Sequence, residues 1–154
     1  MMSSSAASVV SRFIASVDQL IAGVRVDPLQ YLAEDAVLEV IGTTPISGIY
    51  RGREEIRLLF GCTAQRLIAS GSVQQFDVIA DGEEVAAFLN IRLTTPAGEV
   101  YNAQVDPAGC WFRVVGDKLV EIRLFPDTTQ VETQLFGRRF VPNEARGSQS
   151  GGGS

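Results

Sequence analysis

The stretch YLAEDAVLEVIGTTPISGIYRGREEIRLLF, residues 31–60, decides the fold expected for this chain. Its segment AVLEVI, residues 36–41, is rich in β-branched residues and is bounded by acidic residues and a turn, which predicts a buried strand. A helix is predicted after Gly52, because Glu54 and Glu55 fall in its first turn, where the helix dipole favours carboxylates. Its apolar residues recur every three or four positions: Ile56, Leu59, Phe60, Ala64, Leu67 and Ile68. We expect this strand and helix to form one wall and one rim of a pocket.

The remaining segments predict more helix before this stretch and more strand after it. Helical patterns cover residues 8–23 and the short stretch after Asp27-Pro28, where Asp is a helix cap and Pro is the first helical residue. Four strands are expected at 73–80, 83–95, 100–115 and 118–125. The third is expected to be broken or bulged at a type I turn formed by the Asp-Pro-Ala-Gly sequence, residues 106–109. Helices followed by an antiparallel meander, with one early strand, indicate the α+β class.

Length and composition favour one globular domain, which we expect to cover residues 1–142. Residues 143–154 end in GSQSGGGS and are expected to be a disordered tail, in part an artificial linker. A net charge of −5 with a single lysine argues against a nucleic-acid partner. No apolar run approaches the roughly 20 residues that cross a bilayer, and no secretory signal is evident, so we expect a cytoplasmic protein with no membrane partner.

The absence of histidine limits the chemistry available to the chain. It removes the commonest metal ligand and the commonest acid or base near neutral pH, and with them every Ser-His-Asp or Cys-His arrangement. The two cysteines, Cys62 and Cys110, lack metal-ligand spacing and are expected to be free thiols. We therefore expect neither a metal nor an organic cofactor.

Three segments carry a resemblance to a known family. They are YLAEDAVLEVIG with the following P-x-SGIYRGREEI, the hairpin FRVVGDKLVEIRLF, and the closing PDT. Together they resemble the SnoaL-like and ketosteroid-isomerase-like branch of the nuclear-transport-factor-two-like superfamily, over roughly residues 8–140. The resemblance implies a cone-shaped, curved, mixed or antiparallel sheet wrapped around N-terminal helices. It does not imply one activity, because this fold serves isomerases, epoxide hydrolases, cyclases, dehydratases and binding domains.

The polar groups that the resembling enzymes use are missing here. The ketosteroid isomerase tyrosine and its two aspartates correspond to Phe13, Val40 and Cys110. The arginine and the two aspartates of the limonene-epoxide-hydrolase type correspond to Phe88, Asn90 and Leu124. Neither chemistry can therefore run in its usual form.

The expected pocket is mostly apolar and suits a hydrophobic small molecule. Asp106 and Asn90 are the candidate catalytic groups, as acid or base and as ligand orienter. The Asp-Pro-Ala-Gly setting of Asp106 favours a plain turn residue, and Asn90 also suits a structural hydrogen bond. The candidate ligand-binding residues are Phe13, Val17, Val40, Phe60, Phe88, Tyr101, Cys110, Phe112, Ile122 and Leu124. The same residues could simply be core, and Cys110 could be a small buried hydrophobe.

Three functions are compatible with this pattern. The first is a SnoaL-like isomerase, cyclase or lyase that acts on a hydrophobic polycyclic or terpenoid-like molecule without the usual isomerase residues. The second is a non-catalytic binding protein of the same fold, and the third is a dimerising structural domain. Loss of turnover with retained binding on Asp106→Asn would distinguish the first from the second.

A homodimer is expected to form through the sheet. One face of the strand at 83–95 is fully apolar and is expected to lie on the outside: Val85, Ala87, Leu89, Ile91 and Leu93. Trp111 and Arg113 are expected on that same face, and an uncovered apolar face of this size favours pairing of two sheets. In the alternative, residues 131–141 fold back over the sheet and leave a monomer.

Overall fold

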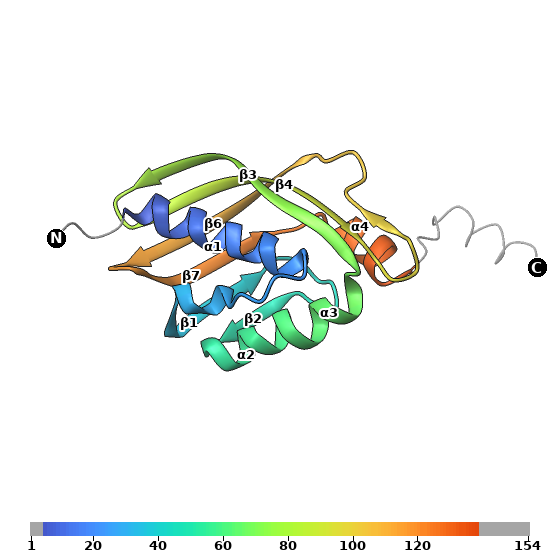
Figure 1. Cartoon of the computed structure of the whole chain (residues 1–154), viewed down its shortest axis with the longest axis horizontal. Helices are drawn as coiled ribbons and strands as arrows, with labels where there is room; N and C mark the ends of the chain where they lie inside the picture. Colours follow the sequence, from blue (N-terminus) through green and yellow to red (C-terminus); the bar gives the residue numbers. More distant parts are fainter. Residues whose placement is uncertain (1–4, 139–154) are drawn as a thin grey trace, which may run out of the picture.

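The computed structural model of the protein describes residues 5–138, apart from the side chains of Cys62 and Thr63. It contains one strongly curved mixed sheet with helices on its concave side (Figure 1). The predicted α+β class and the curved sheet around an N-terminal helix are confirmed. The predicted tail, residues 143–154, lies outside the described residues, as does the Cys62 side chain.

The strands lie in the order β2–β1–β7–β6–β4–β3, with β5 paired to β4. β1 and β7 pair in parallel, and the other pairings are antiparallel. The strand bounds are Leu32–Val40 (β1), Gly48–Arg51 (β2), Ser70–Asp81 (β3), Glu84–Thr94 (β4), Val100–Tyr101 (β5), Pro107–Val115 (β6) and Lys118–Phe125 (β7). The parallel pairing of β1 with β7 brings the early strand and the last strand of the chain side by side, so both contribute to the same core.

The long helix α1 (Ala6–Ile21) crosses the concave face and contacts β3, β4, β6 and β7 (Figure 1). Its start is fixed by Ser5, whose hydroxyl accepts the N–H of Ser8 at 3.1 Å, as expected for an N-cap. The 3₁₀ turn η1 (Pro28–Tyr31) follows, capped by Asp27, whose carboxylate accepts the Leu29 N–H at 3.1 Å. This confirms the predicted Asp-Pro helix start.

The helix predicted after Gly52 forms, but it is not a single regular α-helix. It consists of α2 (Gly52–Leu58), the π-helical segment η2 (Leu59–Thr63) and α3 (Ala64–Leu67). The short strand β2, which pairs with β1 just before this helix, was not predicted. It lies within the Pro- and Gly-rich stretch, where the turn residues hide a strand of four residues.

The predicted break in the strand at 100–115 is present, since β5 ends at Tyr101 and β6 begins at Pro107, but the turn is not at residues 106–109. β6 already begins at Pro107, and the chain turns earlier, between Asn102 and Val105, which both have positive φ (58° and 55°). Asn102 closes this loop, since its Oδ1 accepts the Asp106 N–H at 2.9 Å and its Nδ2 donates to the carbonyls of Ile91 and Asp106. Pro107 is tolerated because the first residue of a strand need not donate to the ladder.

The predicted orientation of β4 is also wrong, and with it the proposed outer apolar face. Val85, Ala87, Leu89 and Leu93 are buried on the concave side, in contact with the rest of the core. The outer face instead carries Phe88, whose ring lies 6.3 Å from that of Phe76, and Trp111, which lies under the Arg123 guanidinium at 5.0 Å. Both faces of this strand are apolar enough to be buried, so alternation alone could not decide which faces inward.

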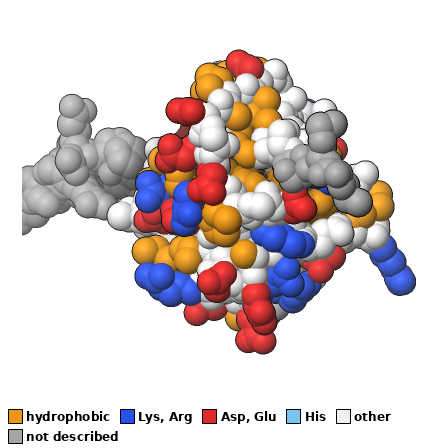
Figure 2. All heavy atoms as spheres, turned by 90° about the vertical axis from the view of Figure 1, so that its left-hand side faces the viewer, with side chains coloured by type: hydrophobic (Ala, Val, Ile, Leu, Met, Phe, Trp, Pro, Cys, Tyr) orange, Lys and Arg blue, Asp and Glu red, His pale blue; other side chains and the backbone are white. Residues whose placement is uncertain are grey.

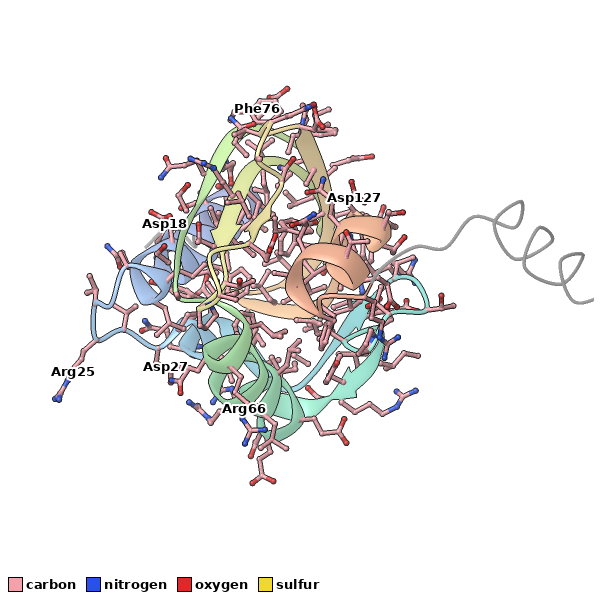
Figure 3. The ribbon with its side chains drawn as sticks, turned by 90° about the vertical axis from the view of Figure 1, so that its right-hand side faces the viewer. Asp18, Arg25, Asp27, Arg66, Phe76 and Asp127 are labelled. Atoms are coloured by element: carbon pink, nitrogen blue, oxygen red, sulfur yellow. The ribbon has the colours of Figure 1, made fainter. Side chains whose placement is uncertain are left out.

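The C-terminal part of the described chain closes the open end of the cone. α4 (Thr128–Gln130) and the π-helical turn η3 (Val131–Leu135) begin at the capping residue Asp127 and cross that end of the sheet (Figure 3). This segment covers the concave side of the sheet, where Val131 and Leu135 line a pocket. Residues 131–138 therefore do not cover the outer face, which is what the alternative to the dimer predicts for residues 131–141. Residues 139–141 lie outside the described range.

Acidic and basic side chains are interspersed on the end of the molecule drawn in Figure 2, and neither sign dominates that face. Among the described residues, no helix combines the length and the apolar character needed to span a membrane.

Candidate functional site: an apolar pocket in the cone

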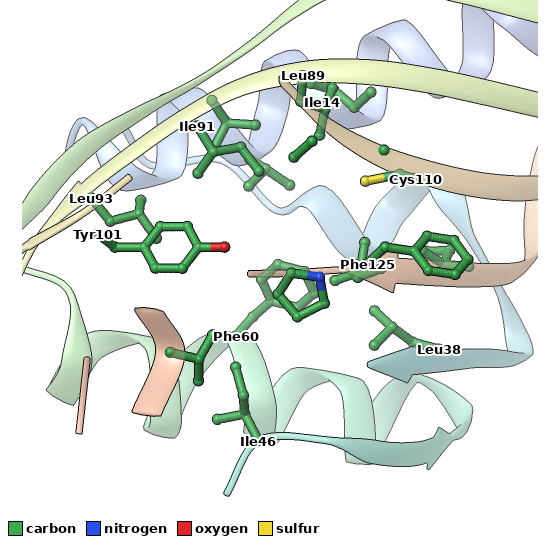
Figure 4. Close-up of a pocket in the computed structure, with 18 of the residues that line it drawn as sticks. Ile14, Leu38, Ile46, Phe60, Leu89, Ile91, Leu93, Tyr101, Cys110 and Phe125 are labelled. Atoms are coloured by element: carbon green, nitrogen blue, oxygen red, sulfur yellow. The ribbon is translucent and has the colours of Figure 1, made fainter. Parts of the chain in front are cut away.

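A pocket of about 190 Å³ lies between α1, the concave face of the sheet and the α4–η3 segment (Figure 4). Its lining is almost entirely apolar: Phe13, Ile14, Val17, Leu38, Ile46, Phe60, Val73, Leu89, Ile91, Leu93, Tyr101, Ala108, Gly109, Cys110, Phe112, Ile122, Leu124, Phe125, Pro126, Val131 and Leu135. Phe125, at the end of β7, is the most exposed of the large hydrophobic lining residues, at 48%. The site therefore offers a small molecule an almost entirely apolar interior.

Alternation along three neighbouring strands builds the pocket wall. β4 contributes Leu89, Ile91 and Leu93, while β6 and β7 contribute residues from the positions that face the same side. Phe13 of α1 anchors the opposite wall, since its ring meets those of Phe60 and Phe112 edge-on at 6.4 and 6.1 Å. Edge-to-face aromatic pairs of this kind hold ring orientation as well as bury area. The wall of the pocket opposite the sheet is therefore built on packed aromatic rings.

Tyr101 brings the pocket's one side-chain oxygen among the described lining residues. It comes from the two-residue strand β5, and its hydroxyl points towards the middle of the cavity in Figure 4. That hydroxyl accepts the backbone N–H of Asp127 at 2.9 Å, which ties β5 to the start of α4. Burial raises the pKa of the Tyr101 phenol above its ordinary value of 10.0, so the group is a neutral hydrogen-bond donor near pH 7.

Cys110 is the other titratable residue of the lining. It lies on β6, is 7% exposed and forms no disulfide. Burial raises the pKa of its thiol to about 12, so at neutral pH it is a protonated, poorly nucleophilic side chain. A thiol in this setting acts as a small polarizable surface for a ligand, in the way that methionine does elsewhere.

Most of the residues predicted to contact a ligand lie in the pocket wall: Phe13, Val17, Phe60, Tyr101, Cys110, Phe112, Ile122 and Leu124. Val40 and Phe88 do not. Val40 is buried in the core beside the pocket, and Phe88 lies on the outer face against Phe76. Their placement corrects the expectation that both contact the ligand.

The two predicted catalytic residues do not line the pocket. Asp106 is exposed at the end of the loop before β6, and its backbone N–H and carbonyl, not its carboxylate, are the groups that Asn102 binds. Asn90 alternates with the inward-facing Leu89 and Ile91, which places it on the outer face. The structure therefore does not bring Asp106 and Asn90 together at a site.

Among the lining residues that the sequence interpretation missed, two groups had a signal in the sequence. Leu89, Ile91 and Leu93 form one apolar row in the sequence, which predicts that they share a face, but they line the pocket and not the predicted outer face. Val131 and Leu135 were seen only as part of a C-terminal segment, although their spacing of four residues is the signal of one helical face. Among the described residues no cluster of three or more Cys, Asp or Glu could hold a metal ion.

Comparison with solved structures places this architecture in a known fold. A nuclear-transport-factor-two-like protein of unknown function from Burkholderia pseudomallei superposes with a TM-score of 0.70, at 17% identity over 86% of this chain and 98% of that chain. TerC, co-crystallised with polyporic acid, gives 0.69 at 14% identity over 85% and 98%. A ketosteroid-isomerase-like protein from Catenulispora acidiphila, in complex with trimethylamine, gives 0.63 at 16% over 84% and 97%.

The chain therefore has the nuclear-transport-factor-two-like fold. Identities below 20% in these comparisons carry the fold and no activity. No protein-family model matches the sequence, and no curated protein sequence matches it significantly.

Proposed function

We propose that this protein binds a neutral, hydrophobic small molecule in the pocket and does not transform it. The observation that carries the proposal is the pocket's lack of an acid or base that works near neutral pH. Tyr101 and Cys110 are the titratable groups among the described lining residues, and burial raises the pKa of both. A charged ligand would lose its hydration in this pocket without gaining a charged partner.

The volume of the pocket limits the size of the ligand. An apolar cavity of about 150 Å³ is enough to hold benzene. At about 190 Å³, this pocket suits a body of one ring or a small terpenoid, and a four-ring polycyclic body would extend beyond it. The terpenoid-like end of the expected ligand range is therefore favoured.

The fold is compatible with a binding role, because TerC and the Catenulispora protein, which share it, each hold a small organic molecule. The isomerase, cyclase or lyase expected from the sequence depended on Asp106 and Asn90, and neither faces the pocket. Binding is therefore the function that this geometry supports best.

Calorimetric titration and thermal unfolding with p-cymene and with 4-isopropylbenzoate test the proposal. The two molecules share one ring and an isopropyl group and differ in charge. At a hundredfold excess over its Kd, p-cymene should stabilise the protein by about 2.7 kcal/mol, which corresponds to roughly 5–10 °C in Tm. The benzoate should bind at least tenfold more weakly, and mass spectrometry should recover the p-cymene unchanged.

A matched pair of variants locates the binding. Ala108 lies opposite Leu89 and lines the pocket, so Ala108→Leu should fill part of the cavity and weaken p-cymene binding. Ala80→Leu adds the same side chain at an exposed position of β3 and should leave the affinity unchanged. Equal affinity for the benzoate, or no effect of Ala108→Leu, would show that the ligand does not occupy this pocket.

A further inference from the structure

The hydroxyl of Tyr101 has an unused hydrogen-bonding capacity that faces the pocket. Its oxygen accepts the Asp127 N–H at 2.9 Å, and no described residue accepts its proton. The residue is 5% exposed, so bulk water does not surround this donor. A buried donor without a partner costs free energy, and a ligand that supplies an acceptor removes this cost.

The position of this donor is fixed by the surrounding elements. Tyr101 pairs with Leu93 in the β4–β5 ladder, and the next residue, Asn102, is locked by its side-chain hydrogen bonds. The Asn102 N–H also donates to the side-chain oxygen of Gln130 in α4, so two hydrogen bonds join the β5 turn to the α4 segment. The hydroxyl is thus held in place before any ligand arrives, which is what a selective site needs.

We propose that Tyr101 is the specificity-determining residue of the pocket, and that it selects ligands with one hydrogen-bond acceptor, such as a ketone or an ether oxygen, on an otherwise apolar body. This inference rests on the proposed binding function. The Cys110 thiol does not provide an equal alternative, because S–H is a weak donor. In this proposal the ligand's oxygen lies beside Tyr101, and its apolar body contacts the rest of the lining, which includes Phe13 and Phe112.

Acetophenone and α-methylstyrene are the probes for this inference. The two molecules have nearly the same shape. Acetophenone carries a carbonyl oxygen at the position where α-methylstyrene carries a methylene group. Calorimetric titration of the wild type gives the ratio of their affinities. In Tyr101→Phe, acetophenone should lose about tenfold in affinity, the worth of one neutral hydrogen bond at the upper end of its range, and α-methylstyrene should change by less than about twofold.

Gln130→Ala is the matched control. It removes the other hydrogen bond between the β5 turn and α4. The pairing of Tyr101 with Leu93 and the bond from the Asp127 N–H still hold the Tyr101 hydroxyl, so this variant should not alter the ratio of the two affinities. If both probes bind the wild type and Tyr101→Phe weakens them equally or leaves both unchanged, the role of Tyr101 is overturned while the binding function stands. If neither probe binds the wild type, the proposed function fails and this inference with it. A change of the ratio in Gln130→Ala as large as in Tyr101→Phe would assign the effect to loosening of the segment, and would also overturn the role of Tyr101.

Discussion

Burial of the Cys110 thiol makes the stability of the fold sensitive to alkali. The pKa of this thiol rises from its ordinary 9.0 to about 12 in the folded state. Below pH 9 the thiol is protonated in both states and the full stability is present. Between pH 9 and 12 the unfolded chain loses this proton first, so the free energy of unfolding should fall by up to about 1.4 kcal/mol per pH unit. Tyr101 acts in the same direction at higher pH, because burial raises its pKa too.

Urea unfolding at pH 8 and at pH 10.5 measures this loss. The comparison is between Cys62→Ala, in which Cys110 is the remaining thiol, and the double variant Cys62→Ala/Cys110→Ala. The double variant should start less stable at pH 8, because it enlarges the pocket, but should lose less stability on going to pH 10.5. Equal losses in the two proteins would mean that Cys110 ionises as easily in the folded state as in the unfolded chain.

For single residues, the sequence predicts the apolar character of the pocket better than it predicts which way each side chain points. The apolar character of Phe13, Phe60 and Phe112 was enough to expect a hydrophobic pocket, and all three lie in its wall. Phe88 and Asn90 were misplaced because their neighbours in β4 are apolar on both sides, and a shift of one residue exchanges the two faces of a strand. The missing information was long-range, because the inner face of β4 is the one that packs towards α1, a helix far earlier in the chain.

The pairing of β3 with β4 depends on a glycine at the point where β3 begins. Gly71 lies opposite Leu93, and a Cβ at this position would overlap the carbonyl oxygen of Arg92 and lie 3.0 Å from the Leu93 Cα. These are backbone atoms and cannot rotate away. Gly71→Ala should therefore destabilise the protein by about 1–3 kcal/mol, seen as a lower Tm in thermal unfolding.

Gly61→Ala provides the control for this substitution. Gly61 lies in the helical segment η2, and a Cβ there would meet no atom within 4 Å. Because alanine is favoured over glycine in helices, this variant should keep its stability or gain up to about 1 kcal/mol. If Gly71→Ala is as stable as Gly61→Ala, the strands can separate at this point without cost and the close approach does not matter for stability.

Elements with local signals were predicted well, and elements defined by their partners were not. The β7 strand has the bounds that its sequence predicted, because the Gly116-Asp117 turn and Pro126 delimit it locally. β2 was missed because it exists only through its pairing with β1. The loop before β6 was misplaced because the side chain of Asn102, rather than the Asp-Pro-Ala-Gly sequence, turns the chain there.

At the scale of the whole molecule, the expected homodimer stays a prediction, but the face that would form it has changed. Of the residues predicted for the interface, Val85, Ala87, Leu89 and Leu93 are buried in the core. Trp111 and Arg113 lie on the outer face, as predicted. The outer face presents Phe88 beside Phe76, which is 52% exposed, and Trp111 among the charged side chains of Arg113, Glu121 and Arg123. Aromatic residues and arginine are the types enriched at interfaces. We propose that two copies pair through this aromatic face.

Two neighbouring residues on opposite sides of β4 separate assembly from folding. Light scattering at micromolar concentration should give the wild type about twice the chain mass of 16.6 kDa. Phe88→Glu places a charge on the outer face and should reduce the mass to that of one chain while p-cymene binding persists, whereas Leu89→Glu buries a charge in a residue that is 4% exposed and should abolish the fold itself. Leu58→Glu, on the exposed side of α2, should change neither. A wild-type mass of one chain would contradict the dimer. A Phe88→Glu protein that remains a dimer would place the interface elsewhere. Neither result would affect the proposed binding in the pocket, because Phe88 and the pocket lie on opposite sides of β4.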